Sequence, residues 1–289
     1  MRATFILFLF FGVLTKSVGQ NVLSRSLEYY KAGKLNEAKL VIDSAMRLPE
    51  YQQLPTTWYL QGFIYKDLYK ADDTRTAYRD KAIESFIRLG QLDKDKRFTK
   101  ESSQNVRFLA ATYYNEGIRF IEAGRFDDAV ASYEKFEKVA IAANDSVLRN
   151  PESKAKFYLV LGSGIMKYGR ENKQEKLTSA KAIECFEKVL AIDSGSREAN
   201  YNIAVIYYND AVNRILSLDY DAVNFEDYSK FEDAIIELFH KSLPYMTRAY
   251  RMDPNDLGVI EGLAGIYFGL RDFDASNKYK QELAVASKR

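Results

Sequence analysis

The chain has 289 residues, of which 47% are hydrophobic and 14% aromatic, so it carries enough apolar material for a large core. Only 15 glycines and 5 prolines interrupt it, which favours long helices over a sandwich or barrel of short strands. The formal net charge is +2 with closely mixed signs, which argues against long disordered tracts and against nucleic-acid binding, since that requires a clustered positive excess.

Residues 1–19 have the pattern of a secretory signal peptide. A short positive start at Met1-Arg2 precedes an apolar run from Ala3 to Leu14, and Ser17-Val18-Gly19 supplies small residues for cleavage before Gln20. We therefore expect an exported protein, periplasmic or secreted, with a retained anchor as the alternative. The apolar run is shorter than the about 20 residues that span a bilayer, and no later segment is apolar enough, so we expect no integral membrane segment after cleavage.

From residue 20 to 289, a pattern of small and aromatic residues recurs six times. The copies are predicted at residues 20–52, 55–97, 110–143, 155–196, 197–256 and 257–289. In the third copy, two stripes with i, i+4, i+7 spacing follow each other: Tyr113, Gly117 and Phe120, then Ala129, Tyr133 and Phe136. That spacing places each stripe on one face of a helix. Gly124 lies between the stripes and can end the first helix in a left-handed conformation.

The prolines agree with this division of the chain. Pro49 and Pro55 lie between copies one and two, Pro151 precedes copy four, and Pro254 lies between copies five and six. Each is where a helix is expected to stop or start, because proline lacks a backbone donor. By the same reasoning, Pro244 is expected to begin a new helix or to kink the helix that contains it.

These copies resemble the 34-residue tetratricopeptide repeat (TPR), in which two antiparallel helices meet at small residues. The most specific match is Trp58, Gly62 and Tyr65 in copy two, and Met252-Asp253-Pro254-Asn255 is a family-like ending for copy five. The resemblance implies an all-α, right-handed superhelical solenoid of about six TPR-like helix pairs. In that family the first helix of each pair lines a concave surface, which suits a peptide or a partner's helix.

The spacing between the small residues of the two helices varies along the chain. It is 12 residues in copies one, three and six, as from Gly117 to Ala129, and 20 in copies two and four, as from Gly62 to Ala82. Eight extra residues can add about one turn to each helix. In copy five the spacing is 38, from Ala204 to Ser242, which predicts a larger helical insertion. The lengthened pairs are expected to form ridges at one edge of the solenoid.

The family register also predicts which residues line the groove. The inward-facing set is Tyr59, Phe63, Tyr114, Ile118, Leu159, Ser163, Tyr201, Val205, Tyr208 and Phe268. Its aromatic character favours an apolar or tyrosine-rich ligand. TPR proteins that clamp a chaperone's carboxylates place Lys and Asn at such positions, and these copies do not. Some of the set can instead pack against neighbouring helices.

The sequence carries no recognisable catalytic or metal-binding motif. No phosphate-binding glycine loop or nucleophile elbow occurs. Cys185 stands alone in an apolar stretch, which predicts a small core residue, and His240 is predicted on a helix as a structural or solvated side chain. The acidic pairs Asp72-Asp73 and Asp127-Asp128 fit a loop and a helix start. We expect no metal, no cofactor and no enzymatic activity.

The sequence therefore predicts a non-enzymatic scaffold or assembly factor of the cell envelope that binds a protein or peptide partner and no nucleic acid. The alternative is an exported glycan-binding accessory protein or a helical-repeat glycoside hydrolase, because aromatic residues that stack on sugars look the same in a sequence. Glycan binding requires exposed aromatic rings with carboxylates or amides close by, whereas a peptide groove runs along several copies.

Overall fold

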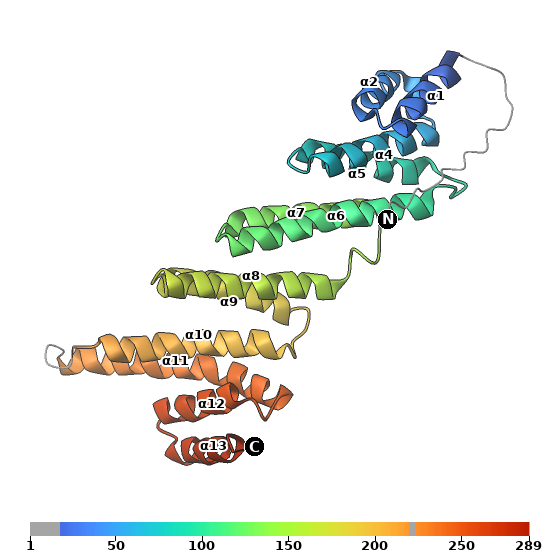
Figure 1. Cartoon of the computed structure of the whole chain (residues 1–289). Coiled ribbons are helices and arrows are strands. Elements are labelled where there is room, and N and C mark those ends of the chain that lie inside the picture. The colour runs from blue at the N-terminus through green and yellow to red at the C-terminus, as the bar shows by residue number, and fades with distance from the viewer. Residues whose placement is uncertain (1–17, 220–223, 289) are drawn as a thin grey trace. The chain divides into compact units, whose positions relative to one another are not determined.

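The computed structural model describes residues 18–219 and 224–288, with helices throughout and no strand in that part of the chain (Figure 1). The all-α prediction is therefore confirmed. The predicted signal peptide at residues 1–19 lies, except for its last two residues, outside the described residues. None of the described helices carries an apolar stretch long enough to cross a membrane.

The helices form two compact units. The first contains the described residues up to 112 together with 136–145, and the second contains 113–135 together with 146–288. The helices that lie wholly in the first unit are α1 (Val18–Lys31), α2 (Leu35–Ala45), α3 (Pro49–Gln52), α4 (Pro55–Ala71) and α5 (Thr76–Leu92). Those that lie wholly in the second are α8 (Pro151–Glu171), α9 (Glu175–Leu190), α10 (Arg197–Ser217), α11 (Phe225–Met252), α12 (Leu257–Gly269) and α13 (Phe273–Ala286). Helices α6 (Thr99–Glu122) and α7 (Phe126–Ala142) contribute residues to both.

Within each unit, consecutive helices pack as pairs, and the pairs stack on one another. The pairs are α1/α2 and α4/α5 in the first unit, and α8/α9, α10/α11 and α12/α13 in the second (Figure 1). Helix α2 packs on α4, α9 on α10, and α11 on α12. A single pair leaves one apolar face uncovered, so this stacking is what gives each unit a continuous core.

Tyrosine–carboxylate hydrogen bonds join the first two pairs across their interface. The Tyr30 hydroxyl on α1 donates to Asp67 on α4 at 2.6 Å, and the Tyr65 hydroxyl on α4 donates to Asp43 on α2 at 2.8 Å. Burial and the neighbouring carboxylate together raise the pKa of both tyrosines, so the hydroxyls stay protonated and act as donors.

The predicted small residues lie where paired helices approach most closely. A Cβ added at Gly62 would lie 2.7 Å from the ring of Phe86 on the partner helix, and one added at Gly162 would lie 2.7 Å from the ring of Phe186. At Gly117 the nearest atoms are the Phe157 ring and the Ala129 carbonyl oxygen, at 3.1 and 3.3 Å. These glycines face neighbouring helices, as the repeat requires.

Serines replace glycine at three of these crossings and bond across them. The Ser26 hydroxyl donates to the Ala38 carbonyl at 3.0 Å, and the Ser276 hydroxyl donates to the Ala264 carbonyl at 2.8 Å. The Ser242 hydroxyl donates to the Ala204 carbonyl at 2.8 Å. That last bond joins residues 38 positions apart, so the register chosen across the insertion in copy five is the one that the structure shows.

The turns follow the expected backbone chemistry. Gly33 and Gly124 have φ angles of +73° and +71°, left-handed conformations that cost glycine little. Pro49, Pro55 and Pro151 each begin a helix, where a missing backbone donor is harmless.

The insertion in copy five lengthens both helices of the pair. Helix α10 has 21 residues and α11 has 28, whereas α12 and α13 have only 13 and 14. Helix α11 continues through Pro244, so of the two alternatives expected there, a new helix or a kink, the first is wrong. The buried face of α11, which includes Phe239, Ser242 and Met246 on either side of the proline, holds the helix in place despite the lost hydrogen bond.

Candidate functional site

Three cavities of the second unit open between consecutive helix pairs, at the edge where the first helix of each pair turns into the second. We call this edge the turn edge. The first cavity, of about 470 Å³, lies between the turn after α6 and the end of α8. The second, of about 770 Å³, lies between the α8/α9 turn and α10. The third, of about 550 Å³, lies between the α10/α11 pair and the α12/α13 pair.

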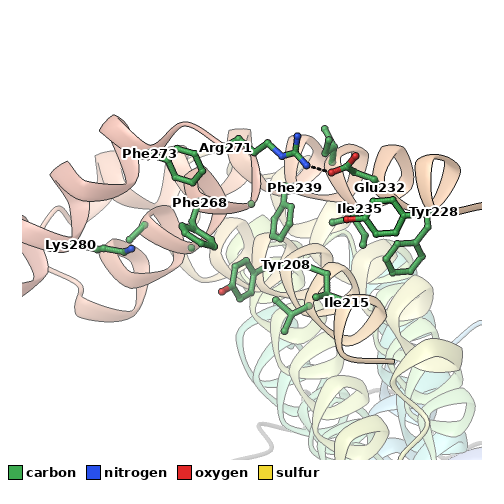
Figure 2. A pocket seen from close by; sticks show the side chains of 16 residues that line it. Tyr208, Ile215, Tyr228, Glu232, Ile235, Phe239, Phe268, Arg271, Phe273 and Lys280 are labelled. Carbon is green, nitrogen blue, oxygen red and sulfur yellow. Dashed lines mark hydrogen bonds and ion pairs between the residues drawn. The ribbon is translucent and has the colours of Figure 1, made fainter. Parts of the chain in front are cut away.

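The third cavity has the most apolar wall, and we call it the aromatic cavity (Figure 2). It exists because α10 and α11 extend beyond the short α12/α13 pair, so the apolar side chains at their far ends are not covered by that pair. Its apolar lining is Tyr208, Val212 and Ile215 from α10, Tyr228, Phe231, Ile235, Ile236 and Phe239 from α11, Ala264, Gly265, Phe268 and Gly269 from α12, and Phe273 from α13. Pockets of this size and lining commonly bind an apolar group.

Two glycines of α12 allow the cavity wall to pack closely. Any side chain at Gly269 would collide with the Phe239 ring, and a Cβ at Gly265 would lie 2.5 Å from the Tyr208 hydroxyl. The rings of Tyr208 and Phe239 meet edge to face with their centroids 5.8 Å apart. This inner wall is therefore closely packed.

The rim of the cavity combines exposed aromatic rings with charged side chains. Phe268 and Phe273 are 57% and 54% exposed, and their ring centroids are 5.7 Å apart. The Lys280 ammonium lies 5.0 Å from the centre of the Phe268 ring, and Arg271 forms an ion pair with Glu232 across the opening (Figure 2). Exposed rings beside charged groups are typical of surfaces that bind other proteins.

Comparisons with known proteins give similar folds only at low identity. No protein-family model matches the sequence, and no curated protein matches it. A structure of MamA protein is 18% identical over 79% of this chain and 92% of its own, with a TM-score of 0.36. PilF of Pseudomonas aeruginosa is 14% identical over 92% of this chain and 90% of its own, with a TM-score of 0.35. PilW, a type IV pilus biogenesis factor, is 16% identical over 94% of both chains, with a TM-score of 0.32.

These TM-scores are too low to indicate a shared overall arrangement. The packing within the chain itself indicates the type of repeat. Small residues at the crossings, left-handed glycines between paired helices and stacked pairs are all present. The helix pairs are tetratricopeptide-like.

Several residues of the predicted TPR groove line the three cavities. Tyr208 and Phe268 line the aromatic cavity, Val205 lines the second cavity, and Leu159 and Ser163 line the first. The cavities belong to the turn edge because their walls also include the starts of the second helices.

The other predicted groove residues pack between helices. Tyr59 is only 7% exposed, and its hydroxyl donates to Glu101 on α6 at 2.5 Å. Burial and that carboxylate raise the pKa of Tyr59. Its ring also contacts Phe98 and the half-buried Phe63, each at 4.7 Å between centroids. In the first unit these side chains therefore stabilise the stacking of α4 on α6.

Tyr114, Ile118 and Tyr201 are half-buried in the second unit. The Tyr114 ring lies 6.0 Å from that of Phe157, and the Tyr201 hydroxyl is close to Gly258 at the start of α12. Both tyrosines have a raised pKa because of burial. None of the three lines one of the three cavities.

The sequence analysis did not predict the cavity-lining residues that come from the insertion in copy five. Phe231, Ile235 and Phe239 are spaced four residues apart on α11, which is the stripe of an amphipathic helix. This stripe is visible in the sequence. Its role is not, because it depends on how far α11 extends beyond the shorter pair that follows.

The chemistry of these cavities is suited to binding. The described residues bring together no cluster of three or more His, Cys, Asp or Glu side chains that could hold a metal ion. Cys185 is buried, which raises the pKa of its thiol to about 11, so it is a protonated core residue as predicted. The carboxylate of the aromatic cavity, Glu232, is held by Arg271.

Proposed function

We propose that this chain is a non-catalytic scaffold that binds a protein partner along the turn edge. The aromatic cavity accepts a bulky apolar side chain of that partner. The observation that carries the proposal is the pair of half-exposed rings, Phe268 and Phe273, at the mouth of an apolar cavity of about 550 Å³. Covering such rings is favourable, because their exposure to water is unfavourable.

The magnitude of this contact indicates the kind of partner. An aromatic side chain buries about 150–250 Å² of surface, which at ~25 cal/mol per Å² gives about 4–6 kcal/mol. Association costs about 4–15 kcal/mol in lost freedom. One side chain in the aromatic cavity is therefore too weak to hold a partner, so the partner must also contact other parts of the turn edge.

Peptide binding tests the proposal directly. A fluorescein-labelled Gly/Ser peptide that carries two tryptophans is titrated with the full-length chain and followed by fluorescence anisotropy, with an alanine version as reference. We expect only the tryptophan peptide to bind. Replacing Phe268 with Ala removes an anchor of the cavity and is expected to weaken binding about fivefold or more. The matched control is Phe225→Ala, since Phe225 is 88% exposed and lines none of the three cavities.

Two results would contradict the proposed site. One is equal binding of the tryptophan and alanine peptides by the full-length chain. The other is an equal loss of binding in Phe268→Ala and Phe225→Ala, which would indicate non-specific adsorption to exposed rings. Circular dichroism of both variants verifies that their helix content is unchanged.

We further propose that the chain acts outside the cytoplasm, in the cell envelope or beyond it. The signal-peptide pattern of residues 1–19 supports this location. Expression in a bacterial host followed by mass spectrometry of the N-terminus tests it. A mature chain that begins at Gln20 in the envelope or secreted fraction is the expected result. A cytoplasmic chain that retains Met1 would contradict it.

A further inference from the structure

The second cavity of the turn edge differs from the aromatic cavity in its polarity. It lies between the α8/α9 turn and α10, and we call it the basic cavity. Its lining is Met166 and Arg170 from α8, Lys173 from the turn, Glu175, Lys176, Thr178 and Ser179 from α9, and Val205, Ile206, Asn209, Asp210, Asn213, Arg214 and Ser217 from α10. Four of these side chains are basic and two are acidic, in a chain whose total charges nearly balance.

Three of the basic side chains have no carboxylate partner among the described residues. Arg214 is bound by Asp210 at 3.1 Å, so these two charges cancel. Arg170, Lys173 and Lys176 form no ion pair within the part of the chain that the structure describes, and Glu175 is the one remaining acidic group of the cavity. The excess positive charge is therefore free to attract an anionic group from outside.

Lys176 also occupies a position that ordinary helix electrostatics disfavours. It lies in the first turn of α9, where the backbone dipole is positive and acidic residues are preferred. Lys173 precedes it in the α8/α9 turn, where its left-handed φ of +55° closes α8. A residue that breaks a local rule, as Lys176 does, is expected more often at a functional position.

Helix α10 separates the two cavities. Tyr208, Val212 and Ile215 line the aromatic cavity on one side of it, whereas Asn209 and Asn213 line the basic cavity on the other. A helix with its side chains is about 10–12 Å wide, and an extended chain covers about 3.3–3.6 Å per residue. Three or four residues of an extended segment therefore cross α10 from one cavity to the other.

We propose that the partner segment carries acidic residues that enter the basic cavity, three or four positions away from the bulky apolar residue in the aromatic cavity. This inference rests on the proposed function and specifies the chemistry of its partner. The second contact adds the affinity that the apolar side chain alone does not supply. An acidic protein segment fits better than a nucleic acid, because the positive charge is confined to one cavity and the adjoining cavity is apolar.

A set of labelled peptides tests this arrangement with the full-length chain. Each peptide carries one tryptophan and a pair of acidic residues in a Gly/Ser background. The tryptophan and the acidic pair are separated by none, three or eight residues. In the amide version of each peptide, Asn and Gln replace Asp and Glu. We expect the acidic peptide with a three-residue separation to bind about fivefold more tightly than its amide version at low salt. The difference is expected to shrink at high salt, where exposed charges are screened.

Matched variants identify which lysines cause the preference for the acidic peptide. The substitutions Lys173→Gln and Lys176→Gln together are expected to remove the preference for the acidic peptide. The control pair is Arg119→Gln and Lys156→Gln, since both residues are exposed in the same unit and line none of the three cavities. The control pair is expected to keep the preference.

The outcomes separate this inference from the proposed function. Tight binding of the tryptophan peptide without any effect of the acidic pair overturns the inference alone. The inference alone is also overturned if Lys280→Gln, at the aromatic cavity, abolishes the preference for the acidic peptide while the double lysine variant keeps that preference. Tighter binding of a labelled oligothymidine than of every peptide overturns it as well. Failure of every tryptophan peptide to bind overturns both.

Discussion

Gly62 and Gly90 belong to the same helix pair but have opposite surroundings. A Cβ at Gly62 would lie 2.7–2.9 Å from three atoms of the buried Phe86 ring, whereas nothing lies within 4 Å of a Cβ at Gly90. Gly62→Ala is therefore expected to overpack the crossing of α4 and α5 and to lower the free energy of unfolding by ~1–3 kcal/mol. Urea denaturation followed by circular dichroism measures this loss.

The matched control is Gly90→Ala. Gly90 is exposed on α5 and has an ordinary helical backbone. Alanine is a better helix former by about 0.5–1 kcal/mol, so this substitution is expected to stabilise the chain. If both substitutions stabilise, the close contact at Gly62 does not control the crossing.

Tyr250 gives the second unit a sensitivity to alkaline pH. Its hydroxyl on α11 donates to Glu282 on α13 at 2.6 Å, and this hydrogen bond, together with burial, raises the pKa of Tyr250 to about 12. An unfolded tyrosine titrates near 10. Because the folded pKa is the higher one, the contribution to stability is complete below pH 10 and is lost as the pH rises toward 12.

The Tyr250→Phe variant tests this pH dependence. It lacks the titrating hydroxyl, so its melting temperature is expected to fall less than that of the unchanged chain between pH 9 and pH 11. Both proteins lose stability from their other tyrosines, and only the difference between them is informative. Parallel curves would show that the hydrogen bond to Glu282 is not formed in solution.

At the scale of single helices, Asp256 fixes the start of α12. Its carboxylate accepts hydrogen bonds from the backbone amides of Gly258 and Val259 at 2.9 and 3.2 Å, and it also forms an ion pair with Arg197 at the start of α10. Asp256→Ala is expected to cost about 0.5–2 kcal/mol, the usual loss for an N-cap. Asp256→Asn keeps the cap and loses only a partly exposed ion pair worth ~0–1 kcal/mol. Equal losses in a urea titration would mean that the ion pair matters more than the cap.

The pairing of helices was predictable because each crossing leaves a mark on the sequence. A small residue must lie where two backbones meet, so Gly62, Gly162 and Ser242 mark crossings whatever the rest of the pair contains. The number of residues between two such marks then predicts the helix lengths, including the long α10 and α11. The alternative that Pro244 begins a new helix was wrong because the packing of a buried helix face outweighs one lost hydrogen bond.

The candidate site was less predictable. An aromatic residue on the first helix of a pair can face a groove or can pack against the next pair, and both Tyr59 and Phe268 were predicted to line the groove. Tyr59 is buried because a long helix, α6, follows it and supplies Glu101. Phe268 is exposed because the short pair α12/α13 lies beside a much longer one. The lengths of the neighbouring helices, which the residue itself does not reveal, therefore contribute to both outcomes.

At the scale of the whole molecule, stability is expected to be local. Each helix pair contacts mainly the pairs before and after it within its unit, as α10 does with α8, α9, α11 and α12. Repeats with nearest-neighbour contacts behave as a chain of coupled elements, so an opening in one pair spreads to its neighbours and weakens with distance.

Hydrogen exchange followed by mass spectrometry tests this locality with two of the variants above. In Gly62→Ala, the amides of α2, α4 and α5 are expected to lose protection, while those of α12 and α13 keep it. In Asp256→Ala the pattern is expected to reverse, with loss in α10 to α13 and none in α1 or α2. A uniform loss in both variants would mean that the chain unfolds as one cooperative element. If the loss is uniform, a partner bound at the turn edge would stabilise every helix equally. If the loss is local, the stabilisation by that partner would be confined to the second unit.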